Sequence, residues 1–136
     1  MLNSLLLAAA LISAAPDTST PAPQLTLHQI EQNIVHYTNL ERQRHGLPAL
    51  QIDTSLMHSA RRHCGWMANS QSLTHTTQSL AENIAMGQNN SQQAVRDWMN
   101  SPGHRANMLN GSYKRVGAAA YTSRSGATYW CLQLTW

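Results

Sequence analysis

The sequence has little charge and few cysteines. Only 11% of its 136 residues are charged, and serine, threonine, asparagine and glutamine supply most of the remaining polar side chains. The formal net charge is +3, and no run of lysine or arginine longer than a pair occurs. A nucleic-acid-binding protein would carry a basic patch or stripe, so this function is not expected. The length indicates one domain that can bury a core without a metal or many disulfides.

The chain also lacks a hydrophobic stretch long enough to span a membrane. Its most apolar segment, Leu5 to Ile12, is followed by small residues, among which Ser13 and Ala15 suit a signal peptidase site. We therefore predict a signal peptide over residues 1–15, a Pro/Thr-rich linker over residues 16–25 and a folded domain over residues 26–136. No transmembrane anchor would remain after cleavage. No lysine or arginine precedes the apolar segment, which leaves an unstructured or cytosolic N-terminus as the alternative.

Apolar residues at helical spacing predict helices over most of the domain. Thr26 and Gln29 have the spacing of a capping box, which predicts a first helix over residues 27–44. Asp53 is expected to cap a second helix, with Cys64 on its inward face. Residues 80–87 are expected to form a short turn or strand. Two shorter helices should then begin at Ser91 and at Ser101-Pro102.

The end of the chain changes to the period of a strand. "VGAAAYT" and "TYWCLQLTW" alternate in polarity, and "SRSGA" joins them as a hairpin. Trp130, Leu132 and Leu134 share one face of the last strand with Trp136, whereas Cys131 lies on the other. Helices followed by a hairpin predict an α+β fold with helices packed against a mostly antiparallel sheet.

Two residues are candidates for chemistry on their own features. His104 lies in the first turn after Ser101, where the helix dipole favours a neutral imidazole, the form that a metal ligand or general base needs. The alternative is that His104 packs against Trp98 or bonds to the backbone. Glu82 lies among apolar neighbours, so its carboxylate needs a partner, which could be a histidine, a metal or backbone N–H groups.

Several segments together resemble the CAP superfamily of cysteine-rich secretory proteins, antigen 5 and pathogenesis-related 1. They are "TNLERQRHGLPAL", "LTHT", "AENIA", "AVRDWMNSPGHRANML" and "YWCLQLTW", and the likeness covers residues 27–136. The short bacterial branch of exported single domains is the most similar. The resemblance implies a three-layer α-β-α sandwich with a surface cleft.

In eukaryotic members of this superfamily, the cleft carries two histidines and two glutamates that can hold a divalent metal. His75, Glu82 and His104 match three of these positions, whereas Ser101 stands where those relatives have glutamate. Asp97, one helical turn earlier, is a possible substitute. The resemblance therefore implies a weak, pH-dependent zinc site at the three matching residues. A purely structural hydrogen-bonded cluster is the alternative.

The resemblance also implies roles for three further residues. Asn83 is expected to brace the cleft through hydrogen bonds to loop backbone. Cys64 and Cys131 are expected to form a disulfide between helix and sheet, which would stabilise the fold by about 4 kcal/mol in the chain-entropy model. The alternative is two buried free thiols.

Three functions remain open at this stage. The first is a secreted or cell-envelope monomer that binds a lipid, glycan or peptide in its cleft, with an apolar groove near Met86, Trp98 and Met99 as the distinguishing feature. The second is a hydrolase that uses Glu82 and His104 with Ser101 or a metal-bound water, although capping a helix would occupy the Ser101 hydroxyl. The third is an envelope protein whose His/Glu cluster is only structural.

Overall fold

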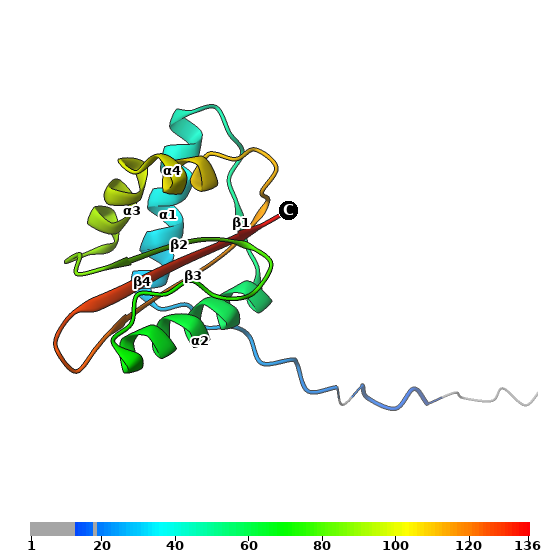
Figure 1. Cartoon of the computed structure of the whole chain (residues 1–136). Coiled ribbons are helices and arrows are strands. Elements are labelled where there is room, and N and C mark those ends of the chain that lie inside the picture. The colour runs from blue at the N-terminus through cyan, green and yellow to red at the C-terminus, as the bar shows by residue number, and fades with distance from the viewer. Residues whose placement is uncertain (1–12, 18) are drawn as a thin grey trace, which may run out of the picture.

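The structure, a computed structural model, describes residues 13–17 and 19–136 (Figure 1). Residues 1–12, most of the predicted signal peptide, lie outside the described part. Residues 13–17 and 19–28 belong to no helix or strand. The elements that follow are α1 (Gln29–Arg44), β1 (Gln51–Ile52), α2 (Thr54–Ser70), β2 (Ala81–Met86), α3 (Ser91–Met99), α4 (Pro102–Met108), β3 (Arg115–Thr122) and β4 (Thr128–Thr135). Across the described residues, no helix is both long enough and apolar enough to cross a membrane.

The elements form the three layers that the resemblance implies. A four-stranded sheet of order β1-β3-β4-β2 lies between α2 on one face and α1, α3 and α4 on the other (Figure 1). The pairs β3–β4 and β2–β4 are antiparallel, and β1 pairs with β3 in parallel, so the sheet is mixed. The sequence did not predict β1, because a strand of two residues carries no periodic pattern.

Strand β4 connects the two cores. Trp130, Leu132 and Leu134 pack into the core beneath α1 and α3, whereas Tyr129 and Cys131 pack into the core beneath α2. A strand in the interior of the sheet must be apolar on both faces when helices cover both. The predicted division of this strand into two faces is confirmed.

The first helix begins later than the sequence predicts. Its N-cap is His28, whose backbone N–H donates to Oε2 of Glu31 at 2.9 Å. Thr26 instead lies outside the helix, and its carbonyl oxygen accepts from Nη2 of Arg61 at 2.7 Å. The predicted Thr26–Gln29 box is therefore wrong, because the glutamate at position 31 offers a charged acceptor that glutamine lacks.

Two other predicted caps can be compared with the structure. Asp53 caps α2 as expected, with Oδ1 accepting from the backbone N–H of Leu56 at 2.9 Å. The cap of α3 is Asn90 and not Ser91, because Oδ1 of Asn90 accepts from the backbone N–H of Gln93. The buried Ser91 hydroxyl donates to the carbonyl oxygen of Ile30 and so ties α3 to α1.

The expected disulfide is absent, and Cys64 and Cys131, both within the described residues, are free, buried thiols. Both lie in the core beneath α2, but each is directed at an oxygen atom. Sγ of Cys64 donates to the carbonyl oxygen of Tyr129 at 3.1 Å, and Sγ of Cys131 lies 3.5 Å from Oε2 of Glu82. Burial raises the pKa of the Cys64 thiol to about 12 and that of Cys131 well above its usual range.

Candidate functional site

The carboxylate of Glu82 is the centre of a buried hydrogen-bond cluster. Its Oε1 accepts from Nδ1 of His75 and from the backbone N–H of Thr76, each at 2.9 Å. Its Oε2 accepts from Nε2 of Gln133 at 2.8 Å. Glu82 lies on β2 and Gln133 on β4, whereas His75 and Thr76 belong to the connection after α2. The carboxylate therefore fixes this connection to the sheet.

The His75 imidazole is oriented by this contact. Because a carboxylate only accepts hydrogen bonds, Nδ1 must carry the proton, and Nε2 of the neutral ring is left with a lone pair. The side chain of His75 is 59% exposed, whereas that of Glu82 is 3% exposed. The pair thus presents one oriented, solvent-accessible imidazole above a buried charge.

His63 is a member of this cluster that the sequence analysis missed. Its Nε2 donates to the carbonyl oxygen of Thr74 at 2.6 Å and lies 3.9 Å from Oε1 of Glu82. His63 is the residue before Cys64 on α2, and nothing in its local sequence indicates which connection this helix will meet. His63 and Glu82 come together only because residues 71–80, which follow α2, pass beside this helix.

Asn83 connects β2 to α4. Its Nδ2 donates to the carbonyl oxygen of His104 at 3.0 Å, and its Oδ1 accepts from Nδ2 of Asn107 at 3.0 Å. Asn83 is fully buried. It therefore makes the kind of bracing bond to backbone that the resemblance implies, although the backbone belongs to a helix.

The remaining candidates lie around this cluster and do not complete it. The His104 side chain is not part of the lining of the cavity described below, and its pKa is lowered by burial and by its electrostatic interaction with His75. Ser101 is the N-cap residue of α4, but its hydroxyl makes no capping hydrogen bond to the described helix, contrary to expectation. Asp97 is exposed and accepts from Nε2 of Gln88, so it does not replace the missing glutamate.

The expected zinc site does not fit this geometry. Among the residues described, no group of three or more histidine, cysteine, aspartate or glutamate side chains could hold a metal ion. Both oxygens of Glu82 already accept hydrogen bonds from protein donors. His75 uses Nδ1 for the carboxylate, so of its two ring nitrogens only Nε2 is left for another partner.

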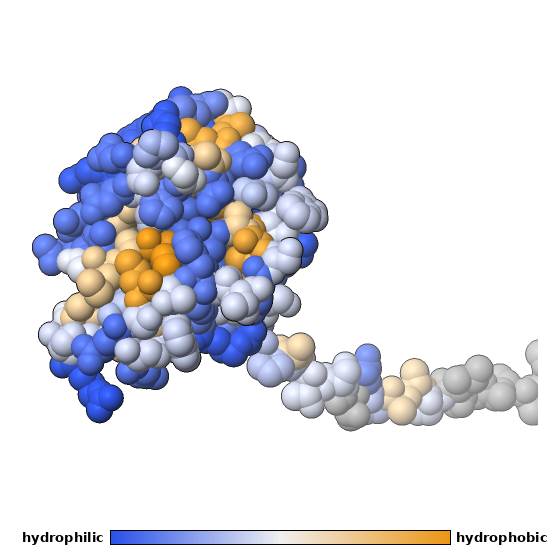
Figure 2. Space-filling model, viewed as in Figure 1, coloured by the Kyte–Doolittle hydropathy of each residue, from blue (hydrophilic) through white to orange (hydrophobic). Residues whose placement is uncertain are grey.

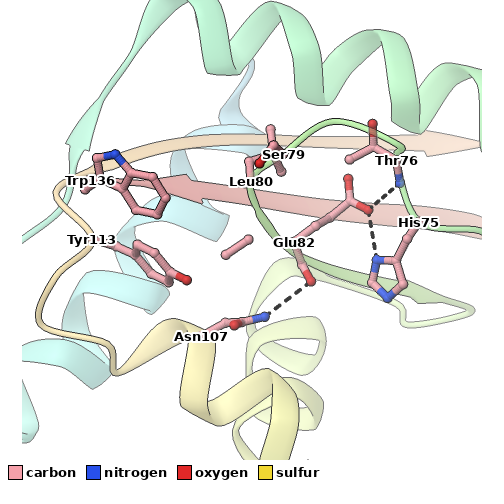
Figure 3. Close-up of a pocket in the computed structure, with 9 residues that line it drawn as sticks. His75, Thr76, Ser79, Leu80, Glu82, Asn107, Tyr113 and Trp136 are labelled. Carbon is pink, nitrogen blue, oxygen red and sulfur yellow. Dashed lines mark hydrogen bonds and ion pairs between the residues drawn. The ribbon is translucent and has the colours of Figure 1, made fainter.

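A cavity of about 430 Å³ opens beside the cluster. Figure 3 shows Tyr113 and Trp136 on one side of this cavity, His75 on the opposite side, and Asn107 and Glu82 between them. The rings of Tyr113 and Trp136 are stacked, with centroids 6.3 Å apart and planes at 25°. The lining consists of His75, Thr76, Ser79, Leu80, Ala81, Glu82, Asn107, Tyr113 and Trp136.

Arg42 holds the segment that carries Tyr113. This guanidinium is fully buried and donates to four backbone carbonyl oxygens, those of Pro48, Met108, Asn110 and Tyr113, at 2.9–3.2 Å. A buried arginine requires such acceptors because its charge is otherwise costly to desolvate. It joins α1 to the connection between α4 and β3, and so sets the position of the aromatic wall.

The layered fold and the cleft segments agree with the comparison to known families. The family model of CAP, the cysteine-rich secretory protein family, matches residues 35–134. The chain belongs to the CAP family. It is 34% identical over 126 residues to the uncharacterized protein YkwD of Bacillus subtilis (strain 168), covering 80% of this chain and 49% of YkwD.

A second relative is the uncharacterized membrane protein YlbC of the same bacterium, 30% identical over 104 residues, which cover 64% of this chain and 30% of YlbC. This CAP chain therefore spans about half the length of YkwD and less than a third of YlbC.

Solved structures of other proteins show the same fold. An outer surface protein from Borrelia burgdorferi superposes with a TM-score of 0.69 at 18% identity, over 76% of this chain and 89% of that protein. An extracellular protein containing a SCP domain from Bacillus anthracis str. Ames gives a TM-score of 0.65 at 24% identity, over 84% of this chain and 45% of that protein.

Proposed function

We propose that this CAP domain binds a neutral saccharide in the cavity between the Tyr113–Trp136 pair and His75. The stacked aromatic pair is the observation that carries the proposal. Aromatic rings combine a large apolar face with a polar edge. A sugar ring presents apolar C–H groups on its faces and hydroxyl groups around its edge, so it is complementary to such a wall and to polar side chains opposite it.

The polar side of the cavity supports the same ligand class. His75 offers an oriented ring nitrogen, and Thr76, Ser79 and Asn107 add hydroxyl and amide groups. Within the described part of the chain, no lysine or arginine lines the cavity, and the single carboxylate, Glu82, is already satisfied by protein donors. A charged ligand would therefore find no lysine, no arginine and no free side-chain carboxylate among these residues.

A lipid is a poorer match than a saccharide. Of the described residues, Leu80 and Ala81 are the only aliphatic ones in the cavity lining. Trp98 and Met99, expected candidates for an apolar groove, are core residues. Met86 is 46% exposed but does not line the cavity. The face of the molecule in Figure 2 is mostly hydrophilic, with hydrophobic areas that polar side chains separate. An acyl chain needs a continuous apolar surface.

The proposed setting is outside the cytoplasm, with the domain acting as a monomer. The apolar segment Leu5 to Ile12 and the peptidase-like site at Ser13 and Ala15 support export. Two structural relatives are described as an outer surface protein and as an extracellular protein. These are properties of the relatives, and they support the proposal by analogy.

Hydrolysis is a second candidate, favoured by the His75–Glu82 pair. A carboxylate that orients an imidazole is one part of a general-base arrangement. The predicted version with Glu82, His104 and Ser101 has less support, because His104 and Ser101 do not line the cavity. A version with a metal-bound water has no assembled ligand set among the described residues to support it.

Isothermal titration calorimetry with N,N′-diacetylchitobiose, a neutral disaccharide, tests the proposal. We expect saturable one-site binding that Trp136→Ala weakens about fivefold or more, since an aromatic contact contributes about 1 kcal/mol. Met86→Ala, which removes another exposed apolar side chain outside the cavity, is the matched control and should bind normally. Absence of binding, or equal loss in both variants, would refute the proposal. Chromatography of the incubated sugar reveals any hydrolysis.

A further inference from the structure

A second hollow lies next to the cavity already described. It has a volume of about 250 Å³ and is lined by His63, Trp66, Thr74, His75, Thr76 and Thr77. His75 and Thr76 line both hollows. Pockets that hold a small molecule on their own usually measure about 300–1,000 Å³. The second hollow is smaller than that, and its shared wall makes it an extension of the first.

The outer wall of the second hollow is a fixed aromatic surface. The rings of His63 and Trp66 are stacked, with centroids 5.8 Å apart and planes at 17°. Trp66 is 49% exposed, although a tryptophan that served only packing would be more buried. The hydrogen bond from His63 to the Thr74 carbonyl oxygen holds the stack against the connection after α2. This surface is therefore ordered before any ligand binds.

The two hollows repeat one pattern on either side of His75. Each has a stacked aromatic pair as a wall, and each has hydroxyl groups facing the space beside it. No lysine, arginine or aspartate from residues 13–17 or 19–136 lines either hollow, and the one carboxylate is the buried Glu82. These linings suit a ligand that is uncharged and that repeats an apolar face with polar edges.

We propose that the two hollows form one groove for a neutral oligosaccharide that crosses His75. One sugar unit contacts the Tyr113–Trp136 pair and a later unit contacts the His63–Trp66 pair. This inference rests on the proposed saccharide-binding function and extends it from a single cavity to a chain-binding groove. His75, whose side chain is 59% exposed between the two aromatic pairs, accepts a hydrogen bond at Nε2 from a hydroxyl of the sugar unit that bridges them.

The test is a length series of β-1,4-linked N-acetylglucosamine oligosaccharides, from the disaccharide to the hexasaccharide, titrated into the full chain by calorimetry. We expect the hexasaccharide to bind about tenfold more tightly than the disaccharide. Trp66→Ala should abolish that gain and leave the disaccharide affinity unchanged. Trp66→Phe keeps an aromatic face and should restore most of the gain. Far-ultraviolet circular dichroism checks that each variant is folded.

Tyr121→Ala is the matched control. Tyr121 is 41% exposed and lines neither hollow of the groove, but it lines a different hollow that Trp66 and Arg62 also border. Loss of hexasaccharide affinity in Tyr121→Ala equal to that in Trp66→Ala would place the ligand in that other hollow and contradict the groove. Disaccharide binding with no gain in longer chains would also overturn it, while leaving the proposed function intact. If no saccharide binds, both the groove and the proposed saccharide-binding function are contradicted.

Discussion

At the scale of single residues, the chain places one of its few carboxylates in the interior. Glu82 is 7% exposed and accepts hydrogen bonds from a side chain of the 71–80 connection, from its backbone and from the neighbouring strand. A buried carboxylate without such donors would be costly. The same bonds that satisfy Glu82 also orient His75, which lines the cavity proposed to bind a saccharide.

Removing the Glu82 side chain should destabilise the protein. In Glu82→Ala, the buried Gln133 amide loses its acceptor, and the Thr76 N–H and His75 lose theirs. We expect the free energy of unfolding in urea to fall by about 3 kcal/mol. Glu82→Gln should lose less, about 1 kcal/mol. If the Gln133 amide rotates, its buried Oε1, which has no partner among the described residues, can accept a hydrogen bond from the new amide N–H at position 82. Equal losses in the two variants would contradict this account.

His104 should make stability depend on pH. Burial and the charge of His75 lower its pKa below the ordinary 6.5, so the unfolded chain binds the proton at a higher pH than the folded protein does. The stability that the protein gains by keeping His104 neutral is fully present above about pH 6.5 and is lost as the pH falls below that value. We expect the urea midpoint of the unmodified protein to fall more between pH 7 and pH 5 than that of His104→Gln. Parallel falls would exclude His104 as the cause.

At the scale of elements, periodic segments were predictable and short or tertiary features were not. The sequence predicted α1, α2 and the β3–β4 hairpin because apolar residues recur there at helical or strand spacing. It missed β1, which exists because its two residues pair with β3. It misplaced the caps of α1 and α3, because several neighbouring polar residues at each of these helix starts are suitable caps.

The candidate site divides in the same way. Residues close in sequence to a recognisable motif, such as His75, Glu82 and Asn83, do lie together in the structure. His63 and Trp66 carry no motif, and α2 brings them to the site only through packing. Among the described residues, no group of three or more possible metal ligands includes His75, Glu82 and His104, which lie 7 and 22 residues apart in the sequence and meet only through the tertiary fold.

One buried ion pair joins α1 to α2. Nε and Nη2 of Arg61 each donate to the Glu31 carboxylate at 2.7 Å, and the Glu31 side chain is 3% exposed. Burial alone would raise the pKa of Glu31, but hydrogen bonds from Arg61 and from the His28 backbone hold it below its ordinary value.

Breaking this pair should be far more costly than breaking an exposed one. We expect Arg61→Ala to lower the free energy of unfolding by about 3 kcal/mol, because it leaves the Glu31 carboxylate buried and unpaired. Arg44→Ala is the matched control, since its pair with Glu41 is exposed and should contribute less than about 0.5 kcal/mol. Urea unfolding of both variants measures the difference. A small loss in Arg61→Ala would mean that water replaces the guanidinium at Glu31.

At the scale of the whole molecule, two helical layers on one sheet supply the stability that a disulfide was expected to supply. The core beneath α1 and α3 and the core beneath α2 share β4, so neither can open without exposing that strand. Cys64 and Cys131 both lie in the second core. Their reactivity therefore reports the opening of the molecule and not a local motion.

Alkylation with iodoacetamide tests this whole-molecule property. The pKa of Cys64 is raised to about 12, and that of Cys131 is raised well above its usual range by the same burial. Because the thiolate is the reactive form, the folded protein at pH 8 should remain unmodified. In urea, without reductant, both thiols should react, and mass spectrometry should detect two adducts. Cys64→Ser should give one. Absence of any adduct in urea until a reductant is added would mean that a disulfide joins the two residues, and rapid modification in buffer would mean that the core beneath α2 opens without global unfolding.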